Sequence, residues 1–243
     1  MTTTLCSMGR WDDALKRSAE IPEKDIAGTP FCAVVGSSIE IHVARGHIER
    51  AEQILALADR CATWVDVPER LIHLLSTTRI FRARGEEDKA LSMAEQALEV
   101  CARLGMSSAF AKAAFVQAAE AAFALKQTAK VEQLLGTIEA LPPGQRSPFL
   151  EAQVARFRAR LAQERGEREG ASAGLEEAAR VFRKLGTPFW EAVALLEHGE
   201  WLSADAGQAD ADALLAGARS IFERLEAGSF LERACRTAMR KTG

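Results

Sequence analysis

One short pattern returns at intervals of about 40 residues along this 243-residue chain, and it limits the possible folds more than any other feature. In each copy a turn residue, most often glycine, is followed five positions later by a small residue. Apolar or small residues return four and seven positions further on, which places them on one face of a helix. The pattern therefore predicts a turn that leads into the second helix of a helix pair. The copies begin at Gly9, Gly46, Gly85, Lys126, Gly166 and Ala206.

The residues five positions after these turns are expected to lie where paired helices approach each other most closely. In the copies that begin with glycine, the residue five positions later is alanine, and after Lys126 it is valine. Only a small side chain fits between closely packed helices, and a larger one is overpacked. The positions of closest approach are predicted to be Ala51, Ala90, Ala171 and Ala211.

A second marker, a hydroxyl residue shortly before a phenylalanine, predicts where the first helix of each pair begins. Serine or threonine at the N-cap, followed by proline in the first turn, is typical of a helix start. None of the seven prolines falls in the interior of an expected helix, where proline costs roughly 3 kcal/mol. One unit has only Val67-Pro68. The complete markers are Thr29-Pro30-Phe31, Ser108-Ala109-Phe110, Ser147-Pro148-Phe149 and Thr187-Pro188-Phe189, with a reduced Ser229-Phe230.

Together the two markers predict an all-α fold, a right-handed superhelical solenoid of antiparallel helix pairs with about 12 helices. Pairs stacked at a fixed period bury a continuous core only through their neighbours. We expect a single domain over 1–243, with an unpaired helix at 10–21, five pairs over 30–226 and a C-terminal capping helix at 229–240. The expected helices span 10–21, 30–45, 48–64, 68–84, 86–104, 106–125, 127–140, 147–165, 167–185, 187–204, 208–226 and 229–240.

Composition and charge exclude several classes of protein. The chain is 48% hydrophobic and 27% charged, which is typical of a folded globular protein, and it has no tyrosine and few other aromatic residues. The net charge of −3 does not favour nucleic acid binding, which usually needs a basic surface. No run of apolar residues is long enough for a membrane span, and no export signal is recognisable. Five scattered cysteines favour a reducing cytoplasm.

The units resemble tetratricopeptide repeats. In that family a glycine marks the turn within a repeat, and alanine, an apolar residue and alanine follow in the second helix; Gly46, Ala51, Leu55 and Ala58 match this pattern. The period seen here is longer than the family's usual length. It is similar to repeats in the C-terminal parts of large bacterial signal-transduction ATPases, cyclase-linked regulators and related transcriptional activators, and residues 178–186 and 218–225 are typical of that group.

The resemblance implies a non-catalytic protein-interaction scaffold, used as a regulatory or sensor segment of a bacterial signalling protein. The alternative is a fragment of an ATP-dependent transcriptional regulator that binds a small-molecule effector in the superhelical groove. Only eight residues precede Gly9, so the first hairpin is expected to lack its first helix. Either the chain is a fragment of a longer protein, or helix 10–21 acts as a cap and offers a surface for self-association.

A search for catalytic and metal-binding motifs finds no phosphate-binding loop, no dinucleotide fingerprint and no nucleophile elbow. His42 and His47 are five residues apart, which is not ligand spacing on one helix face, and His42 is interpreted as a core or groove residue. The acidic run at 86–88 is expected in the first turn of a helix, where the helix dipole favours negative charge. We therefore expect no enzyme activity, no metal and no cofactor.

The resemblance also implies that the first helices of the pairs line a concave face. Arginine is well suited to carboxylates because its planar fork makes two parallel hydrogen bonds. A groove with four arginines favours a protein or peptide ligand of acidic character; in the alternative, the arginines pair with neighbouring glutamates. Charge reversal at two of them, Arg82 and Arg156, is expected to abolish capture without loss of helix. The candidate partner-binding residues are Arg79, Arg82, Glu120, Phe123, Arg156 and Arg160.

Overall fold

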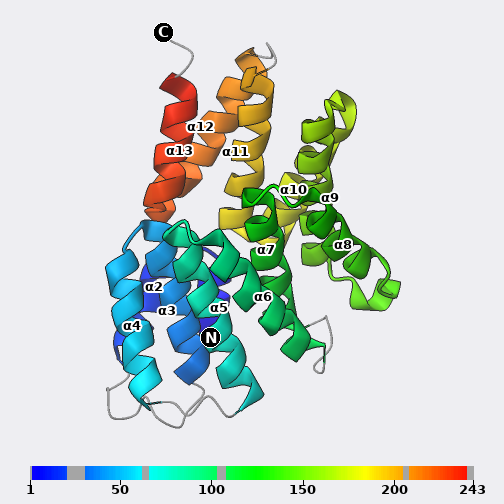
Figure 1. Cartoon of the computed structure of the whole chain (residues 1–243). Coiled ribbons are helices and arrows are strands. Elements are labelled where there is room, and N and C mark those ends of the chain that lie inside the picture. Colours follow the sequence, from blue (N-terminus) through cyan, green and yellow to red (C-terminus); the bar gives the residue numbers. More distant parts are fainter. Residues whose placement is uncertain (1, 21–30, 62–65, 103–107, 205–207, 240–243) are drawn as a thin grey trace. The chain divides into compact units, whose positions relative to one another are not determined.

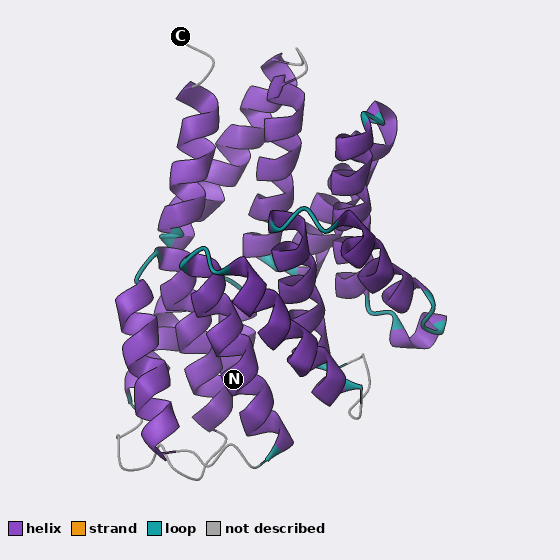
Figure 2. Cartoon of the chain, viewed as in Figure 1, coloured by secondary structure: helices purple, strands orange, loops and turns teal. Residues whose placement is uncertain are grey.

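The computed structural model describes residues 2–20, 31–61, 66–102, 108–204 and 208–239, and these form α-helices and one short 3₁₀ helix without any strand (Figures 1 and 2). The predicted all-α class is confirmed. In chain order the elements are α1 (Thr2–Ser7), α2 (Trp11–Ala19), α3 (Phe31–Arg45), α4 (Ile48–Cys61), α5 (Val67–Ala83), α6 (Glu87–Cys101), α7 (Ala109–Ala124), α8 (Thr128–Glu139), η2 (Pro143–Gln145), α9 (Pro148–Arg165), α10 (Arg168–Leu185), α11 (Pro188–Ala204), α12 (Gln208–Leu225) and α13 (Gly228–Met239).

Twelve of these described helices correspond to the expected ones, and α1 is an addition. The prediction that the residues before Gly9 are too few for a helix is wrong, because residues 2–7 form one. The indole nitrogen Nε1 of Trp11 donates a hydrogen bond to the carbonyl of Cys6 at 3.0 Å, which ties the end of α1 to the start of α2. A helix of six residues is too short to show a periodic pattern, so no sequence signal marks it.

The chain divides into two compact units, one made of residues 1–6 and 10–147 and the other of residues 7–9 and 148–243. In unit 1, α3 packs against α4 and α5, and α5 packs against α6 and α7. In unit 2, α9 packs against α10, and α11 packs against α10, α12 and α13. Within each unit, the first helix of a pair therefore contacts its own partner and a helix of the neighbouring pair. We call the first helices (α3, α5, α7, α9, α11 and α13) the A helices and the second ones (α4, α6, α8, α10 and α12) the B helices.

The turn between the two helices of a pair has the same backbone conformation wherever that turn is described. Gly46, Gly85 and Gly166 have φ angles of 84°, 76° and 76°, in the left-handed region that favours glycine. Lys126 occupies the equivalent position with a φ of 58°, although a lysine there is strained. The expectation that Lys126 keeps the register of the glycines is therefore confirmed. The other expected turn without glycine, at Ala206, lies outside the described residues.

These turns also set where the next helix begins. After Gly85, the amide of Glu86 donates to the carbonyl of Phe81 at 2.9 Å, which is the six-to-one bond of a Schellman motif. The carbonyl of Glu86 then accepts from the amide of Ala90 at 3.0 Å, which is the first bond of the following helix. A single left-handed residue thus ends one helix and starts the next. The same two bonds recur after Gly46, Lys126 and Gly166, and also after Gly9.

The small residues five positions after the turns are all completely buried, which confirms the predicted register. The positions four and seven residues further on are mostly buried as well. The close approach of paired helices is also visible at Gly199 of α11, where a Cβ atom would lie 2.7 Å from Cγ of Leu215 on α12. The residues with 0% exposure at the equivalent positions are Ala14, Ala51, Ala90, Val131, Ala171 and Ala211.

The helix starts follow the predicted markers where these are described. Ser108 is the N-cap of α7, and its hydroxyl oxygen accepts from the amide of Ala111 at 3.1 Å. Pro148 and Pro188 are the first residues of α9 and α11, where a missing amide hydrogen costs nothing. The marker residues Thr29 and Pro30 lie outside the described residues. None of the described helices is both long and apolar enough to cross a membrane.

Exchange of the turn residues should move stability in opposite directions. Replacing Lys126→Gly removes the cost of a left-handed lysine and should raise the free energy of unfolding by about 1 kcal/mol. Gly85→Lys should lower it by a similar amount, because a Cβ at Gly85 meets no atom within 4 Å and only the backbone conformation is tested. Urea denaturation measures both. A loss of stability in Lys126→Gly would contradict the assigned turn.

Enlarging a buried anchor residue should destabilise the fold. Ala90 is fully buried, so that Ala90→Leu should lower the free energy of unfolding by roughly 1–3 kcal/mol through overpacking. The matched control is Ala213→Leu, at an exposed position of α12, which should change stability by no more than about 0.5 kcal/mol. An unchanged thermal midpoint in Ala90→Leu would show that the assigned register is wrong.

Candidate binding surface

The six candidate residues all lie on A helices, as the register predicts. Arg79 and Arg82 belong to α5, and Glu120 and Phe123 belong to α7, so that these four are part of unit 1. Arg156 and Arg160 belong to α9 of unit 2. The structure brings candidates together within each unit, Arg82 with Glu120 in unit 1 and Arg156 with Arg160 at Glu197 in unit 2.

In unit 1, Arg79 forms an ion pair with a glutamate of the preceding A helix. Its Nη2 atom lies 3.0 Å from Oε2 of Glu40 on α3. The arginine side chain is 12% exposed and the glutamate 38%, so the pair is partly shielded from solvent. Glu40 was not among the candidates. It lies 39 residues before Arg79, close to one repeat, and this spacing is the signal that could have identified it.

Arg82 contacts two carboxylates and an amide. Its Nη1 donates to Oε1 of Gln117 at 3.1 Å, Nη2 lies 3.7 Å from Oε2 of Glu120, and Nε lies 3.5 Å from Oε2 of Glu87. Burial raises the pKa of the Glu87 carboxyl, Arg82 lowers it, and Glu120 raises it further. Two partly buried carboxylates thus share one guanidinium. Phe123 is only 8% exposed and belongs to the core of unit 1, so little of its ring is open to a ligand.

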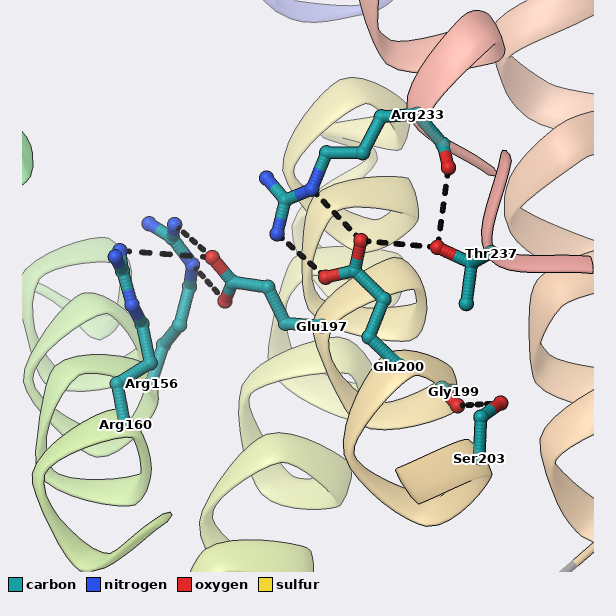
Figure 3. A network of polar contacts seen from close by, with 8 residues as sticks. All are labelled: Arg156, Arg160, Glu197, Gly199, Glu200, Ser203, Arg233 and Thr237. Carbon is teal, nitrogen blue, oxygen red and sulfur yellow. Dashed lines mark hydrogen bonds and ion pairs between the residues drawn. The ribbon is translucent and has the colours of Figure 1, made fainter. Parts of the chain in front are cut away.

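In unit 2, Arg156 forms a buried, bidentate ion pair with Glu197 of the next A helix, α11 (Figure 3). Its Nε and Nη2 atoms donate to the two carboxylate oxygens at 2.7 and 2.6 Å. The side chains are 1% and 5% exposed. Nη1 donates to Oε1 of Gln153 at 3.1 Å, and the guanidinium carbon lies 4.8 Å from the ring centre of Phe157 and 5.6 Å from that of Trp190. Parallel bonds of this kind are the strongest that arginine makes with a carboxylate.

Arg160 adds a second positive charge to the same carboxylate. Its Nη1 lies 3.5 Å from Oε1 of Glu197, and Figure 3 shows both arginines of α9 pointing toward that residue. The side chain of Arg160 is 22% exposed, far more than that of Arg156. Two guanidinium groups therefore contact one carboxylate. Arg160 is its more accessible member.

A third interaction between neighbouring A helices joins α11 to α13. Arg233 donates from Nε and Nη2 to the two oxygens of Glu200 at 2.8 and 2.5 Å, and the hydroxyl of Thr237 donates to Glu200 at 3.3 Å (Figure 3). The side chains of Arg233 and Glu200 are 42% and 26% exposed. Charged residues thus connect neighbouring A helices in both units.

In the structure the four arginines pair with nearby glutamates, as the alternative interpretation of the sequence predicts. Each one contacts a carboxylate of the same unit. Their role in binding a partner stays a prediction. Reversing the charge of Arg156 would place a carboxylate against the buried Glu197, so we expect this change to destabilise unit 2 as well as to remove the positive charge.

Two other sequence interpretations can be compared with the structure. Glu87 and Asp88 lie in the first turn of α6, as expected for charges that favour a helix N-terminus.

His42 and His47 lie closer together than their spacing in the sequence suggested, because the turn at Gly46 places their ring centres 5.8 Å apart. Burial and the neighbouring positive groups, His47 first, lower the pKa of His42 to about 4. Among the described residues no three histidine, cysteine or acidic side chains are placed to hold a metal ion.

Comparison with solved structures supports the repeat fold. The chain is similar to BtubC (BKLC) from P. vanneervenii, with 18% identity, a TM-score of 0.53, and coverage of 88% of this chain and 89% of that chain. Two structures of nearly identical TPR-like repeats from a Podosopora anserina protein of kinesin light chain type match at 19% and 20% identity with TM-scores of 0.46 and 0.45, each covering 77% of this chain and 92% of theirs. No protein-family model matches the chain, and no curated protein does. The fold is that of a tetratricopeptide-like helical repeat domain.

The buried pair between α9 and α11 should contribute more to stability than the exposed pair between α11 and α13. Glu197→Gln leaves the buried charge of Arg156 without its carboxylate and should lower the free energy of unfolding by about 3–5 kcal/mol. Glu200→Gln is the matched control on the same helix, and its partly exposed pair with Arg233 should account for no more than about 1 kcal/mol. Equal losses in the two variants, measured by urea denaturation, would contradict this assignment.

Proposed function

We propose that this chain is a non-catalytic protein-interaction scaffold that binds an acidic peptide segment of a partner protein on the A-helix surface of unit 2. The observation that carries the proposal is the partly exposed guanidinium of Arg160, which lies beside the buried ion pair between Arg156 and Glu197. An acidic side chain of a partner would form an ion pair with the exposed part of this guanidinium. The repeat fold supports the proposal because it presents a row of A helices to a ligand.

Arg160 is the residue of this cluster that a partner can reach. Its contact with Glu197 is 3.5 Å long, whereas the bonds from Arg156 to the same carboxylate are 2.6 and 2.7 Å. Since Arg156 already neutralises Glu197, turning Arg160 toward a partner's carboxylate leaves no buried charge without a counter-ion. The exposed part of Arg160 therefore supplies the attraction, and Arg156 holds the shape of the surface.

In unit 1 the candidate arginines contact several carboxylates, which favours α9 as the place of the acid-binding site. Arg79 and Arg82 lie among Glu40, Glu87 and Glu120, so carboxylates outnumber arginines there. An acidic ligand is repelled where carboxylates are in excess. We therefore place the contact with acidic side chains at Arg160, and propose that Arg79, Arg82, Glu120 and Phe123 shape the A-helix surface of unit 1.

We further propose that the scaffold serves as a regulatory or sensor segment of a bacterial, cytoplasmic signalling protein. The support is the similarity of residues 178–186 and 218–225 to the long repeats of bacterial regulators. Both stretches lie in B helices, α10 and α12, and include buried residues that hold the pairs together. The surface that binds the partner lies on the A helices.

A binding measurement with one peptide and two charge reversals tests the acidic-partner proposal. The probe is a fluorescein-labelled peptide in which two glutamates flank a leucine, titrated at low and at physiological ionic strength. Arg160→Glu should weaken binding by about tenfold or more, because an attraction becomes a repulsion. Binding to the unchanged protein should weaken as salt is added.

The matched control is Arg180→Glu on the B helix α10. Arg180 is 61% exposed and pairs with Glu177 of its own helix, so its reversal makes the same change in net charge on an element outside the A-helix surface. Circular dichroism verifies that both variants keep their helices. Equal binding of the peptide to Arg160→Glu and to the unchanged protein would refute the proposed site, and equal weakening by both reversals would show only a general effect of net charge.

A further inference from the structure

Two aromatic side chains lie on the same face of the A helices as the ion pair between Arg156 and Glu197. Phe149 stands at the start of α9, and positions 149, 156 and 160 are seven and four residues apart, which places them on one side of that helix. Trp190 stands seven residues before Glu197 on α11 and therefore shares its face. The A-helix surface that carries Arg160 thus extends toward the N-terminal ends of α9 and α11.

The two aromatic rings form one apolar patch. Their centres lie 6.1 Å apart with an interplanar angle of 78°, which is an edge-to-face contact. Both rings pack on the core of unit 2, where the ring centre of Phe182 on α10 lies 5.7 Å from that of Phe149 and 6.4 Å from that of Trp190. Phe149 and Trp190 are only half-buried, so part of each is open to solvent. We call these two residues the aromatic patch.

The aromatic patch is continuous with the charged residues of the acid-binding site. The guanidinium carbon of Arg156 lies 5.6 Å from the ring centre of Trp190, and its Nη2 atom lies 2.6 Å from Oε1 of Glu197. The same oxygen lies 3.5 Å from Nη1 of Arg160. Arg156 and Glu197 are 1% and 5% exposed. A ligand on this row of side chains therefore meets the aromatic patch at one end and Arg160 at the other.

A partner segment that uses both ends must span the distance between them. Position 160 is three helical turns beyond position 149, or about 16 Å along the axis of α9. Side chains on a helix lean toward its N-terminus, which brings the guanidinium of Arg160 back toward Phe149. An extended chain advances about 3.3 Å per residue, so four residues cover about 13 Å. An acidic and an apolar residue four positions apart match this surface.

We propose that the partner segment carries a large apolar side chain four residues from its acidic one, and that this side chain packs on the aromatic patch while the carboxylate pairs with Arg160. The inference rests on the acidic-peptide proposal and specifies a second contact of the same partner. Apolar burial supplies affinity that salt does not screen, whereas the ion pair of a partly exposed arginine is screened. Tryptophan and arginine are also enriched among the residues that dominate binding energy at interfaces.

Two fluorescein-labelled peptides test the second contact by fluorescence polarisation. Both carry the same pair of glutamates, and one has a leucine four positions from the pair where the other has an alanine. Each peptide is made in both chain directions, and the tighter-binding direction is used. The leucine peptide should bind the unchanged protein at least about fivefold more tightly, because its larger side chain leaves water. Phe149→Ala should reduce this advantage to less than about twofold.

The matched control is Phe230→Ala on α13. Phe230 is a half-buried aromatic residue of the same unit, and its ring contacts Phe189 and Phe222. Its removal should leave the advantage of the leucine peptide unchanged. A purely structural effect of Phe149→Ala would weaken both peptides equally, so the ratio of the two affinities isolates the contact. Circular dichroism verifies that both variants keep their helices.

The outcomes separate this inference from the acidic-peptide proposal. Equal binding of the leucine and alanine peptides, with both lost in Arg160→Glu, would exclude the aromatic patch and leave the acid-binding site in place. A leucine directly beside the glutamates that binds as tightly as one four positions away would contradict the placement on the patch. Failure of both peptides to bind the unchanged protein would overturn both proposals. If Phe149→Ala does not fold, the two comparisons on the unchanged protein decide the matter.

Discussion

The rest of this structure depends on one left-handed residue in each described turn between the two helices of a pair. This residue directs the next amide back to the preceding helix, and the following carbonyl accepts the first hydrogen bond of the next helix, as between Glu86 and Ala90. The helix therefore begins at the same distance from every turn. That distance explains why a completely buried alanine or valine stands five positions after each of these turns. The regular length of the repeat is a consequence of this geometry and of the similar helix lengths.

The same register determines which charged residues meet across neighbouring A helices. Arg79 lies 39 residues after Glu40, and Glu197 lies 41 residues after Arg156, so each ion pair joins positions close to one repeat apart. The ion pairs differ in solvent exposure and in the ratio of arginines to carboxylates. At Glu197 two arginines share one carboxylate, whereas at Arg82 two carboxylates share one arginine. The proposed contact with an acidic ligand is placed on unit 2 because Arg160 is the more exposed arginine at Glu197.

Much of the fold could be predicted from the sequence because turn chemistry and helical periodicity are local. The turn at Lys126 is the clearest case, since its register with the glycines was sufficient to place it without a glycine. The helix at residues 2–7 was missed because six residues carry no periodic signal. The fold also agrees with the similarity to BtubC, which covers most of both chains.

The candidate surface could be predicted only in part. The register placed the arginines on A helices, but their partners depend on side-chain conformations that a single sequence does not specify. Glu197 was therefore missed, and the burial of Arg156 could not be foreseen, because arginine is usually exposed.

The most direct test of the central claim is an NMR measurement of the backbone at Lys126. A residue with positive φ has its amide hydrogen close to its own Hα, and the intraresidue Hα–HN NOE is correspondingly strong. The structure predicts a strong NOE at Lys126, comparable to that at Glu226, which has a φ of 56°. Right-handed helical neighbours such as Phe123 supply the weak reference. A weak NOE at Lys126 would show that this turn is built differently from the glycine turns, and the common register on which the surface is placed would not hold.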